Sequence, residues 1–419
     1  MSFNEWKTVK LEDTVYILGD GLHGTPKYDE NGEYYFINGN NLDGNIVIDE
    51  KTNKVGFKEY EKFKKDLNDR TIFVSINGTL GRVATYNGEK VVLGKSACYF
   101  NVKHDHSKNY IKYIMHSADF RRYLNTHSTG TTIKNMGLKQ MREFTFQLPP
   151  LEEQKAIAHV LSTLDGKIEV NNQINKILEN MAQTIFKQWF VDFEFPNEDG
   201  EPYKSNGGEM VESELGMIPK GWKVKSVYEL VDSISVKHSF PNDKIVFLNT
   251  SDVYDGEVLL HKETIVQNLP GQAKKSIRKH DILYSEIRPK NKRFAYINFD
   301  SDNYVVSTKL MVLRVKHISS AIVFFLLTCE ATINELQMMA ESRSGTFPQI
   351  TFDNMKYIKI ALPIEEPFPD DISNNFEGII NMISEKRKEN AKLRTIRDSI
   401  LPKLMSGEIR VPIDSEGGG

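Results

Sequence analysis

Residues 148–190 read LPPLEEQKAIAHVLSTLDGKIEVNNQINKILENMAQTIFKQWF, and no other stretch constrains the architecture as strongly. From Ile157, alternating steps of four and three residues reach mostly apolar side chains, with Asn171 and Asn175 in the middle of the series. A narrow stripe that repeats every 3.5 residues is typical of a coiled-coil helix. The full seam is Ile157, Leu161, Leu164, Ile168, Asn171, Asn175, Leu178, Ala182, Ile185 and Trp189. The pattern predicts one long helix over 151–190.

A second stripe in the same phase lies 215 residues further on. Its members are Phe376, Ile379, Ile383, Lys386, Asn390, Leu393, Arg397, Ile400 and Leu404. Either stripe alone is compatible with a helix that faces the core of its own domain. A 40-residue helix is about 60 Å long, however, so much of its seam needs a partner outside one domain. We expect the two helices to pair antiparallel, with Asn175 and Asn390 facing each other and fixing the register.

The whole chain is a tandem duplication with a period of roughly 210–216 residues. FINGNNLDG (36–44) is echoed by FLNTSDVYDG (247–256), and TIFVS (71–75) by DILYS (281–285). CYFNVK (98–103) is echoed by MVLRVK (311–316), and STGTTI (128–133) by SRSGTF (342–347). Each copy alternates short strands with a helical stretch, at 110–124 and 322–339. The fold class is therefore α+β, with two repeat domains separated by an antiparallel coiled coil and related by a pseudo-twofold axis.

The predicted boundaries follow from these patterns. They are a first domain at 1–147, a helix at 148–193, a linker at 194–215, a second domain at 216–363, a second helix and its end at 364–411, and a flexible tail at 412–419.

Composition limits the possible functions of the 419 residues. Cys98 and Cys329 lie far apart, and neither belongs to a spacing typical of zinc ligands. No apolar run approaches the roughly 20 residues of a membrane span. We therefore expect no metal, no membrane and a cytoplasmic protein. The formal net charge of −3 is unusual for a DNA-binding protein. The region 274–293 nevertheless holds eight Lys and Arg residues and two acids, which is either a solvated surface or a phosphate-binding patch.

The segment 148–190 resembles the central conserved region of type I restriction-modification specificity subunits, and SGEIRV (406–411) resembles their C-terminal signature. The resemblance implies two target-recognition domains that each read one half of a split, asymmetric site in double-stranded DNA. It further implies methyltransferase subunits, expected to be two, that bind S-adenosylmethionine, and restriction motor-nuclease subunits that use ATP and Mg²⁺. This chain itself would hold no catalytic residue and no cofactor. It departs from the family pattern where LPIEEPFPDD (362–371) replaces LPPLEEQ.

Two other function classes are an enzyme that acts on DNA by itself and an adaptor that does not bind DNA. A methyltransferase would need an Asn/Asp-Pro-Pro-aromatic motif, which is missing, and a nuclease would need more carboxylates than Asp281 and Glu286 provide. GEKVVLGKSA (88–97) ends like a P-loop but has five residues between its glycines and a strand-like continuation.

A surface role is expected for His104, His106, His116 and His127, which form no metal-binding pair. A coiled-coil adaptor that does not bind DNA is the remaining alternative.

Arg, Asn and Gln on loops are suited to reading bases, whereas Lys, Ser and Thr are suited to holding phosphates. Loops at repeated positions give these DNA-binding candidates: Thr25, Lys27, Asn38, Asn40, Asn77, Arg82, Thr131, Thr132 and Lys134 in the first copy, and Lys237, His238, Arg288, Lys290, Lys292, Arg293, Ser344, Thr346 and Gln349 in the second. A plain surface role is the alternative for each. The aromatic residues Phe186, Phe190 and Phe193 are expected either to dock a methyltransferase subunit or to pack under the adjoining domain.

Overall fold

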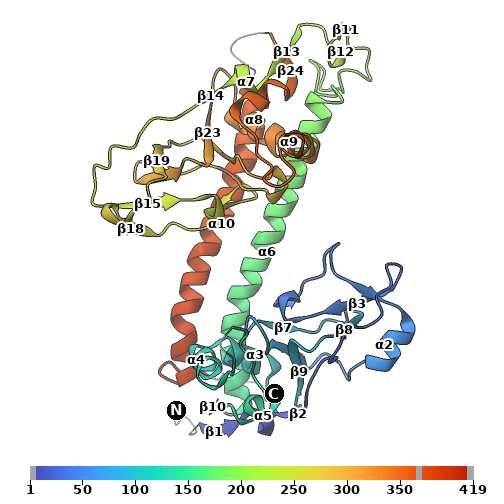
Figure 1. Ribbon diagram of the computed structural model, residues 1–419, viewed down its shortest axis with the longest axis vertical. Helices are drawn as coiled ribbons and strands as arrows, with labels where there is room; N and C mark the ends of the chain where they lie inside the picture. Colours follow the sequence, from blue (N-terminus) through green and yellow to red (C-terminus); the bar gives the residue numbers. More distant parts are fainter. Residues whose placement is uncertain (1–5, 131, 365–369, 413–419) are drawn as a thin grey trace, which may run out of the picture. The chain divides into compact units, whose positions relative to one another are not determined.

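The computed structural model describes residues 6–130, 132–364 and 370–412. The chain divides into two compact units, unit 1 (1–169 and 390–419) and unit 2 (170–389). Each unit contains one repeat together with part of each of the two long helices, α6 (Leu151–Phe190) and α10 (Asp370–Ser406) (Figure 1). The predicted α+β fold with two tandem domains and a coiled coil is confirmed.

The first repeat forms the body of unit 1. Its elements are β1 (Lys7–Lys10), α1 (Leu11–Thr14), β2 (Val15–Asp20), β3 (Tyr34–Ile37), η1 (Gly39–Asn41), β4 (Leu42–Ile46), β5 (Lys54–Val55), α2 (Phe57–Phe63), β6 (Thr71–Ser75), β7 (Val83–Thr85), β8 (Val91–Leu93), β9 (Ala97–Val102), α3 (Lys108–His116), α4 (Ala118–His127), α5 (Leu138–Glu143) and β10 (Thr145–Leu148). The main sheet has the order β2-β9-β6-β7-β4, and β5-β3-β8 forms a second, smaller sheet.

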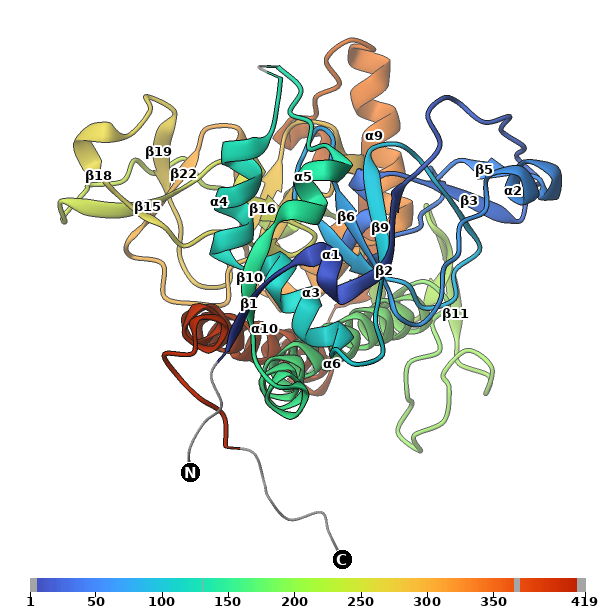
Figure 2. The ribbon, with the colours of Figure 1, turned by 90° about the horizontal axis from the view of Figure 1, so that it is seen from below.

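Alternation along β6 explains why this sheet lies between two apolar layers. Ile72 and Val74 belong to the core that contains α3, α4, α5 and the first turns of α6. Phe73, which points to the opposite face, belongs to the core shared with β3 and β8. Successive side chains of a strand point to opposite faces, so a strand buried on both faces has a continuous apolar run, here Ile72, Phe73 and Val74. All five residues of β6 are buried accordingly. Figure 2 shows β6 beside its neighbour β9 in the main sheet.

Unit 2 repeats this plan. Its elements are β11 (Met210–Ser213), β12 (Gly216–Pro219), β13 (Trp222–Ser226), α7 (Val227–Leu230), β14 (Val231–Ser233), β15 (Lys244–Leu248), η2 (Thr250–Asp252), β16 (Val253–Tyr254), β17 (Glu257–Val258), β18 (Glu263–Ile265), η3 (Val266–Asn268), β19 (Ala273–Ser276), β20 (Ile282–Ser285), η4 (Pro289–Asn291), β21 (Phe294–Tyr296), β22 (Tyr304–Ser307), β23 (Leu310–Val315), α8 (Ser320–Thr328), α9 (Glu330–Arg343), η5 (Phe352–Lys356) and β24 (Lys359–Pro363). The sheets are β14-β23-β20-β21 and β18-β15-β22-β19. As in unit 1, Ile282 and Tyr284 face the helical core and Leu283 faces the opposite core.

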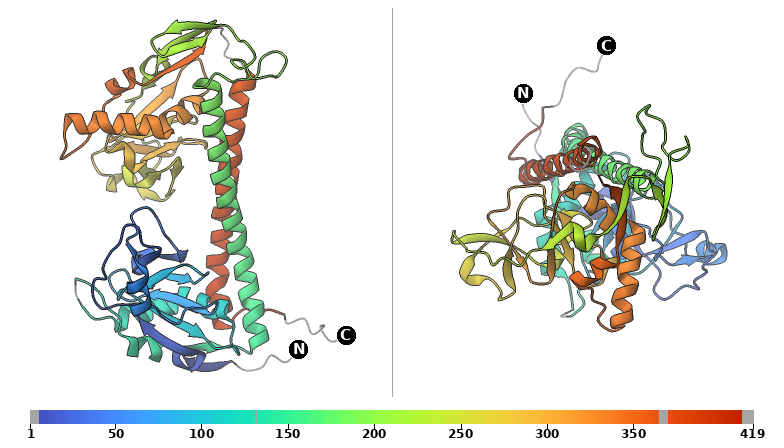
Figure 3. Two further views of the ribbon diagram at one scale, coloured as in Figure 1. Left: turned by 90° about the vertical axis from the view of Figure 1, so that its right-hand side faces the viewer. Right: turned by 90° about the horizontal axis from the view of Figure 1, so that it is seen from above.

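The long helices pair antiparallel within each unit (Figure 3). In unit 1, the start of α6 packs on the end of α10 through Leu161 and Leu404. In unit 2, Phe190 near the end of α6 lies 6.1 Å from Phe376 near the start of α10, measured between ring centroids. Buried or half-buried side chains occupy every expected seam position, Leu164, Ile168, Asn175, Leu178, Ile379, Ile383, Asn390 and Leu393 included. Asn175 and Asn390 belong to different units, so their pairing stays a prediction.

Two features differ from the expectations. The single helical stretches expected at 110–124 and 322–339 are each broken, at Ser117 and at Cys329. At the first break, the Ser117 hydroxyl accepts a hydrogen bond from the Phe120 amide (3.1 Å), which caps α4 and lets the chain turn. The segment expected as a linker, 194–215, contains strand β11, which pairs with β12 directly after it, and Phe195 stacks on Trp222 at 4.8 Å. No described helix is by itself long and apolar enough to span a membrane; α8 and α9 pass only as a pair bent by 64°.

The two motifs that carry the family resemblance meet in unit 1. Glu153 of LPPLEEQ is 1% exposed, and Arg410 of SGEIRV donates to both of its carboxylate oxygens. The indole nitrogen of Trp6 donates to the same carboxylate (3.0 Å), and the Arg410 guanidinium lies over the Trp6 ring. Three segments distant in sequence thus meet at the buried carboxylate of Glu153, which accepts hydrogen bonds from both Arg410 and Trp6.

We expect Glu153→Ala to destabilise unit 1 by about 3 kcal/mol, because it leaves the Arg410 charge without its buried partner. Glu152→Ala is the matched control, since its ion pair with Lys155 is more than half exposed and should contribute less than about 1 kcal/mol. Urea denaturation of the full chain, followed by tryptophan fluorescence, measures both. Equal stability of the two variants would show that the buried pair does not hold the motifs together.

Candidate nucleic-acid interface

Three of the loops predicted in the first repeat come together in unit 1. The Gly78 amide donates to the Lys134 carbonyl (2.9 Å), which ties the β6–β7 loop to the loop at 128–135. The Asn77 side chain donates to the Asn135 side chain (3.2 Å) between the same two loops. Arg82 Nη1 donates to the Asn40 carbonyl (3.2 Å) and so adds the η1 loop. The exposed candidates of this cluster are Asn40, Arg82, Thr132 and Lys134, and Thr131 lies outside the described residues.

Unit 2 builds the same cluster from its own repeat. Arg293 Nη1 donates to the Ser251 carbonyl (3.2 Å), and both residues lie 211 positions after Arg82 and Asn40. Ile287 pairs with Gln349 in an isolated β-bridge, as Asn77 pairs with Asn135 in unit 1. The duplication is therefore preserved at the level of individual contacts between loops.

The basic loop 288–293 has an unusual backbone. Arg288 (φ 44°) and Lys292 (φ 52°) flank η4 in left-handed conformations that cost energy for residues other than glycine. Neighbouring groups hold the loop: the Lys290 amide donates to the buried Gln337 side chain (3.1 Å), and the Arg288 amide donates to the Pro348 carbonyl (3.2 Å). The side chains of Arg288, Lys290 and Lys292 are exposed, so the loop presents cations from a backbone that neighbouring groups hold.

Other candidates have structural contacts or lie apart. His238 is 7% exposed, and its ring nitrogens bond to the Phe240 amide (2.9 Å) and the Asp302 carbonyl (3.2 Å). The structure thus contradicts the expectation that His238 reads DNA, because both polar atoms are used inside unit 2. Asn38 is half-buried and accepts from the Ser96 hydroxyl (3.1 Å), which fixes the turn before η1.

The remaining candidates are mostly at the surface. Thr25 and Lys27 are exposed, but the Lys27 amide bonds to Glu59 of α2 (3.2 Å), outside the loop cluster. Lys237 is exposed beside Lys275, with which it forms a β-bridge. The Ser344 hydroxyl accepts from the Phe347 amide (3.1 Å), and the exposed Thr346 offers its carbonyl to Arg288 Nη2 (3.5 Å). Residues 344–349 therefore belong to the unit 2 cluster.

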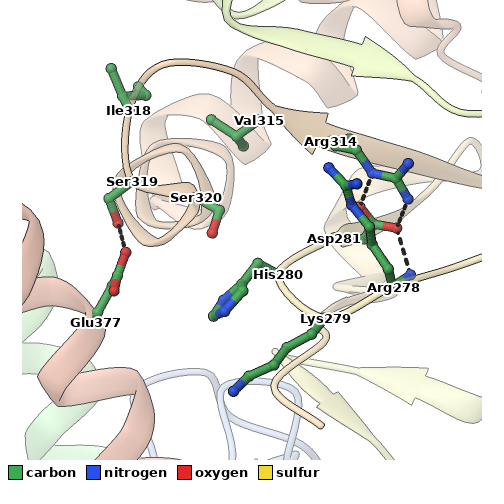
Figure 4. Close-up of a pocket in the computed structure, with 10 residues that line it drawn as sticks. All are labelled: Arg278, Lys279, His280, Asp281, Arg314, Val315, Ile318, Ser319, Ser320 and Glu377. Carbon is green, nitrogen blue, oxygen red and sulfur yellow. Dashed lines mark hydrogen bonds and ion pairs between the residues drawn. The ribbon is translucent and has the colours of Figure 1, made fainter. Parts of the chain in front are cut away.

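A polar cavity of about 230 Å³ in unit 2 contains Asp281, one of the two acids of the nuclease alternative (Figure 4). Arg314 donates to both carboxylate oxygens of Asp281 (2.8 Å each), and the Arg278 amide adds a third bond (2.9 Å). Burial and the neighbouring Lys279 lower the pKa of His280 in the same wall, against a raising effect from Glu377 and Asp281. With its lone pairs occupied, Asp281 serves the fold. The described residues contain no group of three or more His, Cys, Asp or Glu that could hold a metal.

The P-loop-like segment is also structural. Gly94 separates β8 from β9, so a strand rather than a helix follows Gly94-Lys95-Ser96. The Gly94 amide donates to the Ile37 carbonyl (2.8 Å) within unit 1. There is no helix N-terminus at this position to receive a phosphate.

The aromatic residues expected to dock a partner are buried instead. Phe186, Phe190 and Phe193 are 3–6% exposed and belong to the helical core of unit 2. Phe190 contacts the rings of Trp222 and Phe376, at centroid distances of 6.0 and 6.1 Å. The expectation of an exposed aromatic surface is wrong, and the alternative, packing under the adjoining domain, describes the structure. The strand β13 and the start of α10 cover the cluster. The residue spacing along α6 alone does not show that these two segments pack against it.

An apolar stripe missed in the sequence lies on another side of α6. Val170, Ile177 and Met181 are 49%, 58% and 49% exposed, and Ile174 between them is half-buried. These residues are spaced 4, 3 and 4 apart, so they form a second heptad stripe beside the seam. Glu179, two residues after Ile177 and about 200° away around the helix, bonds to Arg387, which bonds to Gly256 in the second repeat. The stripe therefore points away from the domain of unit 2.

The chain is similar to known proteins in sequence and in fold. The family model described as "Type I restriction modification DNA specificity domain" matches residues 4–180 and again residues 219–392. The chain is 39% identical over 188 residues to the type I restriction enzyme HindI specificity subunit of Haemophilus influenzae. The aligned region covers 44% of this chain and 39% of that protein. It is 25% identical over 426 residues to the type I restriction enzyme MjaVIII specificity subunit of Methanocaldococcus jannaschii. That alignment covers 97% of this chain and 93% of that protein.

The solved structure of the S subunit of a type I restriction-modification system from M. genitalium resembles the present one over 96% of each chain. The TM-score is 0.56 at 16% sequence identity, so this likeness concerns the fold.

We expect Phe190→Ser to destabilise unit 2 by about 3 to 5 kcal/mol, because it removes a buried ring and places a hydroxyl in an apolar core. Val191→Ser, at a neighbouring position that is 57% exposed, should change stability by less than about 0.5 kcal/mol. Thermal unfolding of the full-length variants, followed by circular dichroism, measures the difference. A soluble Phe190→Ser variant with unchanged stability would show that Phe190 is not part of the core of unit 2.

Proposed function

Because the chain belongs to the type I restriction-modification DNA specificity family, we propose that each unit reads one half of a split, asymmetric DNA sequence. The paired helices α6 and α10 would hold the two readers at a set spacing along the duplex. The observation that carries the proposal is the repeated loop cluster, in which Arg82 contacts Asn40 as Arg293 contacts Ser251. Identical frames with unlike loops fit a protein that binds the same polymer twice and reads two different sequences.

The chemistry of the two clusters suits DNA. Arginine can donate to guanine in the major groove, and lysine, threonine and backbone amides can hold phosphates. In unit 1 the exposed donors are Arg82, Thr132 and Lys134, and in unit 2 they include Arg288 and Lys290. The cations of the loop 288–293 offset the overall negative charge where the backbone of the duplex would lie.

We propose that the chemistry belongs to partner subunits. S-adenosylmethionine would be bound by methyltransferase subunits, expected to be two, and ATP and Mg²⁺ by restriction subunits, while this chain uses no cofactor. The family assignment supports this division of labour, as does the use of Asp281 inside the fold. The complex would act on DNA in the cytoplasm.

The exposed stripe of Val170, Ile174, Ile177 and Met181 is our proposed contact for a methyltransferase subunit. Its heptad spacing fits an apolar helix of a partner, which would bury side chains that are about half exposed in this chain. Met382 of α10 in the same unit is also exposed, at 54%. The stripe takes the place of the buried aromatic cluster as the docking site.

Exchanging residues 1–147 for those of a related specificity subunit should change one half of the recognised sequence and leave the other half unchanged. Mapping methylated adenines in cells with the wild-type chain, the exchanged chain and no chain identifies both halves. A change in both halves would contradict independent reading, and an unchanged methylation pattern without the chain would contradict the proposed function itself.

Ile177→Lys should reduce recovery of methyltransferase subunits with the full-length chain at least tenfold, because it puts a charge into an apolar contact. Lys176→Glu, an exposed position about 100° around the same helix, is the control and should retain them. Co-purification at equal expression measures both, and melting curves verify folding. Full recovery with a well-folded Ile177→Lys variant would place the contact elsewhere.

A further inference from the structure

Two large apolar side chains protrude from the polar loop clusters at matching places in the repeats. Ile133 ends the motif STGTTI and is 62% exposed, and Phe347 ends the motif SRSGTF and is 54% exposed. Most single exposed apolar residues have no special role. Here, however, both copies of a duplicated loop place an apolar residue at the same position, directly after a threonine, Thr132 in one copy and Thr346 in the other.

Backbone contacts hold both tips in place. In unit 1, Thr129 and Asn135 exchange two backbone hydrogen bonds (2.9 and 2.8 Å) and close a short loop that carries Ile133. The next residue, Lys134, is fixed by its carbonyl to the Gly78 amide of the Arg82 loop. In unit 2, the Phe347 amide donates to the Ser344 hydroxyl (3.1 Å), and the following Pro348 accepts from the Arg288 amide (3.2 Å).

Each apolar tip therefore lies beside residues that can hold phosphates. Lys134 directly follows Ile133, and Arg288 bonds to the carbonyl of Thr346, the residue before Phe347. Among base edges in the major groove, the 5-methyl group of thymine is the apolar one, and apolar side chains recognise it. An apolar tip beside a cationic residue fits that groove, since the cation can bind the backbone while the tip reaches the bases.

We propose that Ile133 and Phe347 each contact a thymine 5-methyl group, one in each half of the DNA site. The inference rests on the proposed function, because it assigns a base contact within that function. A half-site with a methylated adenine contains at least the thymine paired with it, so each half offers a candidate methyl group.

The test replaces thymines one at a time with uracil, which removes only the methyl group and keeps base pairing. The probe is a duplex with the site found by adenine mapping, and the protein is the full chain with its methyltransferase subunits. Fluorescence anisotropy should show that one uracil in each half weakens wild-type binding about three- to fivefold, the effect of losing one buried methyl contact. Ile133→Ala should bind the thymine and uracil forms of its half-site equally and keep the uracil effect in the other half, and Phe347→Ala should do the converse.

Two kinds of variant serve as controls. Ile133→Val, which keeps a branched apolar side chain, should retain most of the uracil effect. Phe57→Ala and Leu260→Ala remove other exposed apolar side chains, one in each unit, and should leave the uracil effect unchanged.

Wild-type binding that is insensitive to every uracil would overturn the inference, as would an undiminished uracil effect in Ile133→Ala or Phe347→Ala. If 2-aminopurine fluorescence rises on binding while uracil has no effect, the tips act as wedges between bases instead. If the wild-type complex showed no sequence-specific binding at all, the proposed function would be wrong. If it bound specifically but without a uracil effect, only the thymine contact would be wrong.

Discussion

The apolar seam of α6 has to be covered along its length, and α10 covers it within both units. A side chain such as Leu161 or Phe190 gains about 1.5 to 3 kcal/mol when it leaves water, so a helix of 40 residues with an open seam would be unstable. Each unit also uses its stretch of the helix pair as part of its own core, with Ile157 in unit 1 and Phe376 in unit 2. The helices are thus an internal component of both recognition domains.

The Glu153–Arg410 ion pair shows how the C-terminal segment contributes to this arrangement. Arg410 follows α10 and returns to the beginning of α6, where Trp6 completes the contact. A buried carboxylate with a bidentate arginine tolerates little displacement, because either charge alone is costly in that position. The motifs at the start of α6 and after the end of α10 therefore meet at one site in unit 1.

The duplication separates the task of building a domain from the task of recognition. The buried strands β6 and β20, with the sequences TIFVS and ILYS, keep the same alternation between two cores. The loops after them differ in length and charge, with INGTLGR in one copy and EIRPKNKR in the other. Because the frame positions Arg82 and Arg293 in the same way, the loop sequences can differ between the two copies without altering the frame.

Periodicity and repetition in the sequence were sufficient to predict the helix at 151–190, its antiparallel partner, the two α+β domains and the loops that cluster in each unit. These features depend on local spacing, which a sequence displays directly. The burial of His238 and of the Phe186–Phe193 cluster depended on strands and helices distant in sequence, and it could be seen only in three dimensions. The same holds for the exposure of Ile177 and Ile133, because an apolar residue in a sequence looks the same whether another segment covers it or leaves it in water.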